Sequence, residues 1–387
     1  MTSPVDVAIV GGGPAGAATA IHLARLGYQV TVFERDRAPV WRACGVFASP
    51  LVRRRLANLG LSRQEIDELH EPISRMELAS ASGARCTLEY RHGLACGFDR
   101  VALDWSLVDR AQRSGADIRR GMVVRDVRVS GEGGDIQLSV LDHEPAPTSV
   151  RARIVIGADG GGSRVARAAG VLSERNWLGR SGITFHIRDD ERPSTRPRTG
   201  RFVFGRGWYV GVAPVPGNRR NVGIVVPATR LKEGVRSIIS KTPPASADPI
   251  DEPQVAGRLE HHVRQAAGEG WLLVGDAIEF IDPLTGEGLH RALVTAELAA
   301  HAVDRWLRGD RNALAVYDRR VRSRFRSKNV LSLVLQAFIA EPSVLDYSLR
   351  RLDRRAALRD ELTAVLADQT SPTRALDPRF LARLLAP

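Results

Sequence analysis

The stretch that decides the fold is VDVAIVGGGPAGAATAIHLARLGYQVTVFER, residues 5–35. Its first six residues form a short apolar run rich in β-branched side chains, which is typical of a buried parallel strand. Glycines at positions 11, 13 and 16 then form a G-x-G-x-x-G pattern, and helical spacing follows as far as Leu26. A second strand is expected over residues 29–33. The stretch therefore predicts one strand–helix–strand unit of the kind that binds dinucleotides.

Each glycine of this pattern has a physical role. Gly11 permits the tight turn, Gly13 lets the backbone approach a pyrophosphate, and Gly16 lets the helix pack close to the strand. The start of the helix offers free N–H groups and a positive dipole end to the phosphates. Glu34, which ends the second strand, is expected to accept hydrogen bonds from ribose hydroxyls. The stretch predicts a bound dinucleotide without distinguishing NAD from FAD.

Two further apolar segments end in turns that carry an aspartate. RARIVIGADGGGSRVARAAG, residues 151–170, predicts a strand, the turn Ala158-Asp159-Gly160 and a helix capped by Ser163. VGDAIEFIDPLTGEGLHRAL, residues 274–293, predicts a strand end, the turn Gly275-Asp276 and the start of a helix. Because the carboxyl ends of parallel strands line one crevice, we expect all three turns to converge on one elongated ligand. An aspartate at a turn also bonds its own backbone, and this alternative stays open for both.

The three motifs together resemble those of flavoproteins with the para-hydroxybenzoate hydroxylase fold, over roughly residues 5–325. The resemblance implies FAD, and not NAD, as the resident dinucleotide. It implies an α/β fold in which a Rossmann-like FAD-binding domain is interleaved with an antiparallel β-sheet substrate domain and followed by a helical C-terminal region. On this basis the FAD-binding domain comprises residues 1–72, 91–175 and 256–325, the substrate domain 73–90 and 176–255, and the helical region 326–387.

The segment DRVALDWSLVDRAQRSGADI, residues 99–118, is similar to another pattern of these flavoproteins, R-x-x-(F/L)-D-x-x-L. The resemblance implies that Arg100 lies against the FAD phosphates, and an i,i+4 ion pair with Asp104 is the alternative. It also implies that Asp159 supports the FAD side of the crevice and that Asp276 bonds the ribityl or pyrophosphate region. The FAD contacts implied in this way are Gly11, Gly13, Pro14, Ala15, Gly16, Glu34, Arg35, Arg100, Val124, Asp159, Gly160, Gly275, Asp276, Pro283, Gly286, Gly288 and Leu289.

Alternating apolar and polar residues predict the strands of the substrate domain. Residues 73–90 are expected to form two strands around Ser82-Gly83, and residues 180–227 more antiparallel strands with a hairpin turn at Pro216-Gly217-Asn218. After Ala292 the chain is expected to be mostly helical. The resemblance implies that this sheet faces the flavin, and it implies three substrate contacts: Phe185, Trp208 and Val210.

Within the superfamily, FIDPLTGEGL (280–289) and ACGVFASPLVRRRLANLGL (43–61) are similar to the geranylgeranyl reductase family, whose members reduce carbon–carbon double bonds in isoprenoid chains. The family's usual Trp in the first strand of GWYVGVAPVPGNRRNVGIVV (207–226) is Val210 here. Aromatic hydroxylases commonly carry a His shortly after G-D-A, where this chain has Ile278-Glu279, and a Gln and an Asn further on. This chain has Glu287 and His290 at those two positions.

The resemblance favours an FAD-dependent reduction of C=C bonds in an apolar isoprenoid, polyketide or aromatic molecule. A monooxygenase that uses NAD(P)H and O₂ is the alternative; a halogenase, suggested by Gly288-Leu289-His290, and an FAD-bearing sensor are minor ones. The resemblance places Cys44 beside the substrate, with a buried inert thiol as the alternative. Glu287 and His290 are the other catalytic candidates, against structural roles at a helix start. Because no second G-x-G-x-x-G appears, NAD(P)H or another reduced carrier is expected to visit transiently.

The charge and the distribution of basic residues limit the classes of molecule that the protein is expected to bind. The 387 residues carry a formal net charge of +12, and Lys232, Lys241 and Lys328 are the only lysines. The arginines are scattered through helical segments and form no basic stripe, so nucleic acid is not expected as a partner. Attraction to anionic substrates or lipid headgroups, and with it peripheral contact with a membrane, stays open.

Three cysteines, Cys44, Cys86 and Cys96, are too few and too badly spaced for a disulfide framework or a zinc site, and no metal is expected. No apolar run reaches the ~18 residues that a membrane span needs, and the first residues lack the pattern of a signal peptide. A cytoplasmic protein is therefore expected, with its oligomeric state left open.

Overall fold

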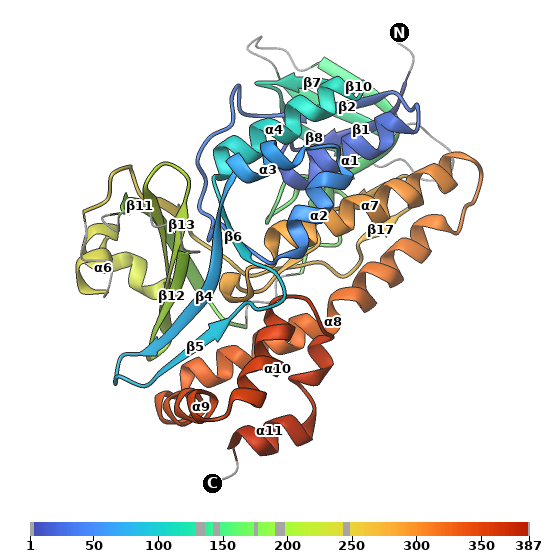
Figure 1. The fold of residues 1–387 in the computed structure, drawn as a ribbon. Coiled ribbons are helices and arrows are strands. Elements are labelled where there is room, and N and C mark those ends of the chain that lie inside the picture. Colours follow the sequence, from blue (N-terminus) through green and yellow to red (C-terminus); the bar gives the residue numbers. More distant parts are fainter. Residues whose placement is uncertain are drawn as a thin grey trace.

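The computed structural model describes residues 4–128, 136–141, 148–173, 177–189, 198–242 and 248–385. Within these residues the chain forms one sheet of eight strands, one of nine and a small two-stranded pair, followed by a C-terminal group of helices (Figure 1).

The eight-stranded sheet is built around the predicted strand–helix–strand unit: β1 (Val5–Val10), α1 (Pro14–Arg25) and β2 (Val30–Glu34). β1 pairs in parallel with β2 on one side and with β10 (Thr148–Gly157) on the other, and β10 pairs in parallel with β18 (Trp271–Leu273). The three strands that precede the predicted turns are therefore neighbours in one sheet. The sheet is completed by β7 (Asp117–Arg120), β8 (Val123–Arg128), β9 (Ile136–Leu141) and β17 (Ala267–Gly268).

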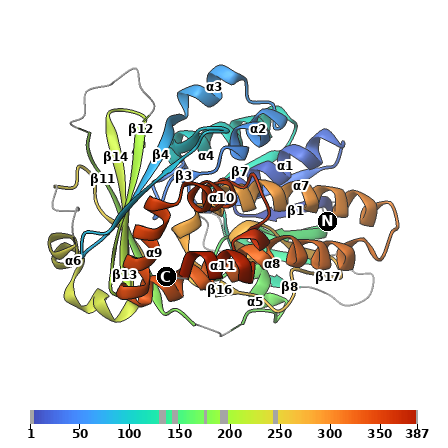
Figure 2. The same ribbon diagram turned by 60° about the horizontal axis from the view of Figure 1, so that its bottom comes forward.

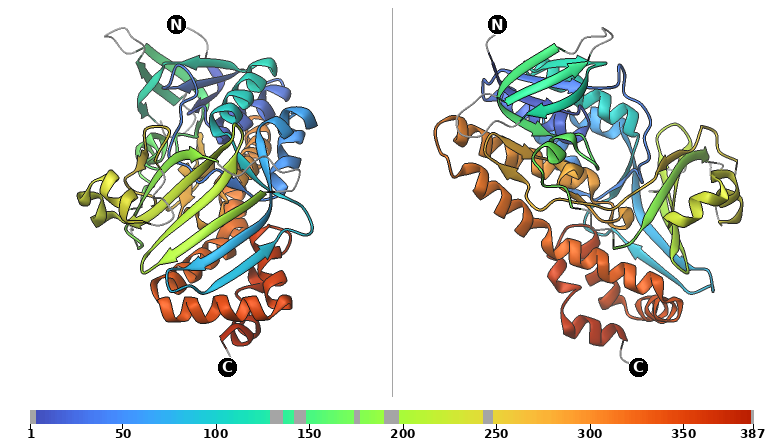
Figure 3. Two further views of the ribbon diagram at one scale, coloured as in Figure 1. Left: turned by 60° about the vertical axis from the view of Figure 1, so that its left-hand side comes forward. Right: turned by 180° about the vertical axis from the view of Figure 1, so that it is seen from behind.

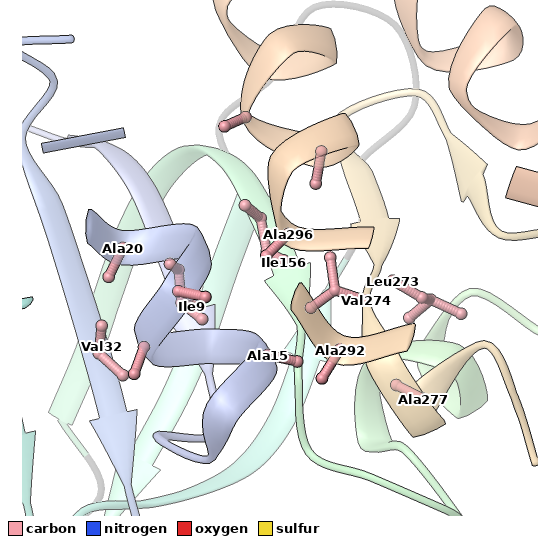
Figure 4. Packing of buried hydrophobic residues seen from close by; sticks show 14 of the residues in the cluster. Ile9, Ala15, Ala20, Val32, Ile156, Leu273, Val274, Ala277, Ala292 and Ala296 are labelled. Carbon is pink, nitrogen blue, oxygen red and sulfur yellow. The ribbon is translucent and has the colours of Figure 1, made fainter. Parts of the chain in front are cut away.

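Small residues let two helices pack tightly beside this sheet. Figure 4 shows Ala15 of α1 next to Ala292 of α7 (Gly288–Leu307), with Val274, which follows β18, nearby. A Cβ on Gly275 would lie 2.8 Å from the Ala15 side chain, and one on Gly16 would collide with the Gly11 carbonyl. Glycine at these positions is therefore required by close approach of the backbone.

The nine-stranded sheet has the order β15-β11-β14-β13-β12-β4-β6-β3, with β5 paired to β4. Its strands are mostly antiparallel, as predicted, but β12 runs parallel to β4. Two of its strands, β3 and β6, come from segments that the sequence assigned to the FAD-binding domain, because β6 pairs with the start of β4. The bounds are β3 Phe47–Ala48, β4 His70–Ser80, β5 Arg85–Glu89, β6 Ala95–Phe98, β11 Arg180–Arg188, β12 Arg198–Gly205, β13 Trp208–Val215, β14 Arg219–Pro227 and β15 Gln254–Ala256.

The two faces of this sheet bury different sets of side chains. Alternate residues such as Phe185 and Val210 form one core with α6 (Val235–Lys241), on what we call the outer face. The other alternate residues, Tyr209 among them, belong to a core shared with the C-terminal helices, and we call this the inner face. Because side chains alternate along a strand, neighbouring residues of β13 point to opposite sides.

The C-terminal helices are α8 (Ala313–Ala340), α9 (Pro342–Arg354), α10 (Ala356–Leu366) and α11 (Pro378–Leu385). Figures 2 and 3 show α8 running from beside α7 to the group that covers β4 and β5. One continuous helix thus crosses the expected domain boundary at 325/326. No single helix in the described part of the chain is long and apolar enough to cross a membrane; α8 and α9 pass that test only as a pair, bent by 110°.

The remaining helices are α2 (Leu51–Asn58), α3 (Arg63–Glu68), α4 (Arg100–Arg113) and α5 (Arg164–Ala168), and the small pair consists of β16 (His261–His262) and β19 (Glu279–Phe280). The cap of α5 is Ser163, as predicted: its hydroxyl accepts a hydrogen bond from the Ala166 N–H at 3.1 Å.

Candidate functional site

The three glycine–aspartate turns meet at one edge of the eight-stranded sheet. The Ala158 N–H donates to the Val10 carbonyl at 2.8 Å, and the Val274 N–H donates to the Gly157 carbonyl at 2.9 Å. Gly11, with φ +103°, lies so close to the Ala158 carbonyl that a Cβ would collide with it. The predicted convergence of the turns is therefore present in the structure.

The start of α1 leaves space for a ligand. Gly13 is the N-cap of the helix and Pro14 follows as its first residue. A Cβ built on Gly13 would meet no atom within 4 Å of it in the described chain, and the same holds for Gly160 and Gly288. Free N–H groups, a positive helix end and an open glycine backbone suit a pyrophosphate, so these residues fit the group that the sequence predicts.

Glu34 lies at this turn with both carboxylate oxygens engaged by the backbone. Its Oε2 accepts from the Gly12 N–H at 2.6 Å, and its Oε1 accepts from the Asp36 N–H at 2.9 Å. A carboxylate oxygen has a second lone pair, so each can still accept a ribose hydroxyl. The next residue, Arg35, is exposed, and Val124 is buried in the core of the sheet.

Arg100 joins two segments that are 56 residues apart. Its Nε and Nη2 donate to the Asp104 carboxylate at 3.1 and 3.2 Å, which is the i,i+4 alternative of the sequence. Its Nη1 donates to the Cys44 sulfur at 2.8 Å, and the Val46 N–H donates to the same sulfur at 3.4 Å. Cys44 is a free, half-buried cysteine, and its place beside the substrate stays a prediction.

Asp276, at the end of β18, lies within electrostatic reach of Arg100. Burial raises the pKa of Asp276, and the charges of Arg291 and Arg100 oppose that rise. The two residues that the resemblance places along FAD thus come from different elements and lie close enough for the charge of Arg100 to act on Asp276.

A histidine that the sequence did not predict bridges two of the turns. The Nδ1 of His261 accepts from the Gly162 N–H at 3.2 Å, and its Nε2 lies 3.1 Å from the Ala277 carbonyl. These bonds define a neutral imidazole that donates from Nε2, and burial lowers the pKa of His261. Asp159 beside it accepts from the Arg164 N–H at 2.7 Å through Oδ2, which is its turn role, while its buried Oδ1 has no partner among the described residues.

The loop of residues 280–287 rests on the inner face of the nine-stranded sheet. The Tyr209 hydroxyl donates to Asp282 Oδ1 at 2.5 Å, and the Leu284 N–H donates to the same oxygen at 2.9 Å. Burial raises the pKa of Asp282 to about 6. Gly286 adopts φ +65° and packs so closely on Phe47 that a side chain would collide with it. Neither Asp282 nor Tyr209 was predicted as a site residue, since 73 residues separate them.

Glu287 and His290 lie in a buried ionic cluster between α7, α8 and the end of α10. Glu287 Oε1 is 2.9 Å from Lys328 Nζ, and Lys328 also binds Asp368. His290 Nδ1 is 4.0 Å from the Asp368 carboxylate, and burial lowers the pKa of His290 to about 4. Both catalytic candidates therefore face the C-terminal helical region, and their catalytic roles stay predictions.

The three substrate residues implied by the resemblance are brought together on the outer face. Phe185 and Val210 are fully buried against α6, and Trp208 packs on the same cluster. The loop that carries Asp282 lies on the opposite face, next to Tyr209. The structure thus brings these three residues together, but on the face of the sheet opposite the loop that carries Asp282.

A family model described as FAD binding domain matches residues 4–329. A digeranylgeranylglycerophospholipid reductase of Methanoculleus marisnigri is 28% identical over 349 residues, which cover 82% of this chain and 82% of the relative. A menaquinone reductase of Mycobacterium tuberculosis is 27% identical over 323 residues, which cover 77% of this chain and 76% of the relative.

Solved structures share the architecture. A geranylgeranyl bacteriochlorophyll reductase-like protein of Thermoplasma acidophilum superposes with a TM-score of 0.76 at 21% identity, covering 99% of this chain and 96% of the other. A flavin-dependent brominase superposes with a TM-score of 0.79 at 16% identity, covering 96% and 97%. At these identities the likeness concerns the fold alone, and it confirms the predicted α/β flavoprotein architecture.

Proposed function

Because the chain belongs to the FAD binding domain family and is an FAD-dependent oxidoreductase, we propose that it reduces carbon–carbon double bonds in an apolar small molecule of the isoprenoid, polyketide or aromatic type. The observation that carries this proposal is the similarity to reductases along more than three quarters of the chain. The DPLTGEG loop and the Cys-Gly segment, which first suggested the geranylgeranyl reductase family, support it.

The chain's own residues would hold the cofactor along the edge where the three turns meet. The start of α1 with Gly13 would receive the pyrophosphate, Glu34 the ribose, and Asp276 the middle of the molecule. The first intrahelical bond of α7 runs from the Arg291 N–H to the Glu287 carbonyl, which leaves the earlier N–H groups of that helix to face the ring. When bound, FAD supplies the redox step, and the protein supplies orientation, charge and exclusion of water.

The Gly13 assignment is testable without any substrate. Gly13→Ala is expected to leave the fold intact, because its φ of −67° suits alanine and a Cβ meets no atom. The same methyl group would occupy the path of the pyrophosphate, so the Kd for FAD should rise about tenfold or more. Gly257→Ala is the matched control, since its Cβ also meets nothing. Equal FAD affinity of parent and Gly13→Ala, measured by calorimetry, removes the pyrophosphate assignment.

The reaction type is tested with the FAD-loaded protein, photoreduced under anaerobic conditions and mixed with an isoprenoid alkene such as geranylgeraniol. Reoxidation without O₂ and a product heavier by two hydrogens support reduction. If reoxidation requires O₂ and the product gains an oxygen atom, the protein is a monooxygenase and the proposal is wrong. A halogenated product in the presence of halide and O₂ identifies a halogenase. The electron donor, NAD(P)H or another carrier, and the cytoplasmic location stay predictions.

A further inference from the structure

Polar residues gather on the inner face of the nine-stranded sheet, where a substrate domain for a purely apolar molecule would carry hydrocarbon. Phe185 of β11 and Val210 of β13 point outward, so Thr184 and Tyr209 beside them point inward. In the ladder, Thr184 pairs with Gly223 of β14, and Gly223 pairs with Gly211 of β13. Gly223 leaves room beside Thr184, whose methyl group would be 3.7 Å from a Cβ on Gly223, whereas the Phe202 ring packs over Gly211, 2.8 Å from a Cβ built there.

Five residues on or against the inner face hold buried polar atoms that have no hydrogen-bond partner among the described residues. Three are on strands of the sheet, one is in the loop of residues 280–287, and one is on α8. The atoms are Arg180 Nη1, Thr184 Oγ1, Asn221 Oδ1, Asp282 Oδ2, and both Nε2 and Oε1 of Gln336. Each of the five residues is at most 8% exposed. A buried polar group without a partner is costly, and native structures contain few of them, so a concentration in one place needs an explanation.

Asp282, Gln336 and Arg180 lie beside the Tyr209–Asp282 hydrogen bond. Thr184 and Asn221 lie further along the same face, since Asn221 pairs with Ala213, four residues from Tyr209, and Thr184 pairs with Gly223. The Gln336 amide of α8 lies close enough to Asp282 to lower the pKa of that carboxyl, but the contact lacks the geometry of a full hydrogen bond. The positive charge of Arg180 lies close enough to act on both Asp282 and Tyr209. A sheet strand, a loop and a helix thus direct unpaired groups toward one another without closing the bonds.

We propose that this cluster binds an oxygen-bearing part of the substrate, a hydroxyl or carbonyl group attached to its apolar body. Unpaired donors (Arg180 Nη1, Gln336 Nε2) suit a carbonyl oxygen, and unpaired acceptors (Asp282 Oδ2, Gln336 Oε1) suit a hydroxyl hydrogen. The inference rests on the proposed function and narrows its substrate class to oxygenated molecules, because a plain hydrocarbon would leave every one of these groups unpaired.

Replacing a polar group that serves the fold and replacing one that serves a ligand should change the stability of the ligand-free protein in opposite directions. If the Gln336 amide served the fold, an apolar residue of similar shape would weaken the ligand-free protein. If the amide serves a ligand, the same substitution removes an unpaired buried group and leaves the ligand-free protein as stable or more stable. Gln336→Met tests this, since methionine matches glutamine in length and neither side chain is branched at Cβ.

The experiment uses the full chain with oxidised FAD and two probes of the same ring skeleton, 2-methyl-1,4-naphthoquinone and 2-methylnaphthalene. The parent is expected to bind the quinone about tenfold more tightly than the hydrocarbon, by calorimetry. Gln336→Met should lose most of that preference, and its ligand-free melting temperature should be equal to or above the parent's. Thr184→Val should show the same pattern, which keeps the test valid if one variant fails to fold.

Three results overturn the proposal: equal binding of both probes by the parent, binding of neither, or a preference that survives both substitutions while the melting temperature falls. The last result would show that ordered water completes the cluster as part of the fold. Because binding to the oxidised protein requires no turnover, a protein that prefers the quinone but reduces no alkene contradicts the proposed reaction and not this site.

Discussion

Two of the buried polar side chains of helix α8, Lys328 and Gln336, lie about two turns apart and differ in the hydrogen bonds they make. Lys328 is 3% exposed and Gln336 is 2% exposed. The ammonium of Lys328 meets three acceptors: Glu287 at 2.9 Å, the Val365 carbonyl at 3.4 Å, and Asp368. The amide of Gln336 lies close enough to Asp282 to lower the pKa of that carboxyl, but neither amide atom forms a full hydrogen bond in the described chain. One helix therefore carries an ammonium with three acceptors at one point and, eight residues later, an amide without a full hydrogen bond, although the Nδ1 of His290 near Lys328 is also unpaired in the described residues.

The difference between Lys328 and Gln336 distinguishes buried polar groups that stabilise the fold from buried polar groups that are free to bind a ligand. Around Lys328, ion pairs connect Glu287, just before α7, to the C-terminal helices. The C-terminal region therefore fixes the position of Glu287. Around Gln336, Tyr209 and the Leu284 N–H bind one oxygen of Asp282, but the other polar atoms form no full hydrogen bond in the described chain and are available to a ligand. Burial alone would have grouped the two residues together; only the count of satisfied hydrogen bonds distinguishes them.

The largest expected effect comes from breaking the completed network. Lys328→Met leaves the carboxylates of Glu287 and Asp368 buried without their cation, and the free energy of unfolding should fall by about 3–5 kcal/mol. The measurement is urea unfolding followed by circular dichroism. Lys241→Met is the control: Lys241 is exposed and only 3.5 Å from Glu233, so its loss should change stability by at most about 0.5 kcal/mol. Equal stability of the two variants would show that the Lys328 network holds nothing.

Two buried groups, His290 near Lys328 and Asp282 near Gln336, should make the stability of the protein depend on pH in opposite directions. Burial lowers the pKa of His290 from 6.5 to about 4, so the unfolded chain binds a proton that the folded chain does not, and stability falls as pH drops below about 6.5. Burial raises the pKa of Asp282 from 3.8 to about 6, so the folded chain holds its proton longer, and stability falls as pH rises from about 4 to 6. Each effect is about 3 kcal/mol in full.

Unfolding curves between pH 4.5 and pH 7 separate the two contributions. His290→Asn should gain stability relative to the parent as the pH is lowered, whereas Asp282→Asn should gain relative to the parent as the pH is raised. Parallel pH profiles for both variants would contradict the assignment of these shifts to burial of His290 and Asp282.

The smallest effects come from two buried threonines that differ in the same way as Lys328 and Gln336. The Thr295 hydroxyl accepts from the Gly275 N–H at 2.8 Å and donates to the Arg291 carbonyl at 2.8 Å, whereas the Thr184 hydroxyl has no partner in the described residues. Thr295→Val should therefore cost about 1–3 kcal/mol, and Thr184→Val should cost nothing or stabilise the ligand-free protein. Melting temperatures of the two variants decide this; a loss for Thr184→Val as large as for Thr295→Val would refute the distinction.

Local turn chemistry made the cofactor edge predictable. Gly11, Gly13 and Gly16 are required by a tight turn and by close approach, and these constraints act within a few residues of the chain. The Arg100–Asp104 pair was also foreseeable from its spacing along a helix. The bond from Arg100 to Cys44 was not, because nothing local in either segment indicates a partner 56 residues away.

The substrate side was less predictable for a different reason. Period-two alternation shows which residues of a strand share a face, but it does not say which face another part of the chain will cover. Phe185 and Val210 are as apolar as a substrate contact would be, yet α6 covers them, and Tyr209 next to Val210 lies beside the Asp282 loop. Likewise, helical spacing predicted helices after Ala292 but not that α8 would continue past residue 325.

The sequence by itself determined the dinucleotide-binding unit, because glycine turns and strand–helix alternation are specified by neighbours in the chain. Its resemblance to known flavoproteins indicated FAD as the cofactor and the family. The tertiary structure alone decided which polar groups are completed and which are left open. Lys328 finds Asp368, and Gln336 finds no partner, through the docking of a helix whose contacts lie 40 and more residues away in sequence. Whether a buried polar group has a hydrogen-bond partner depends on how the whole molecule packs. In this chain, that property distinguishes the polar groups that stabilise the fold from those proposed to bind a ligand.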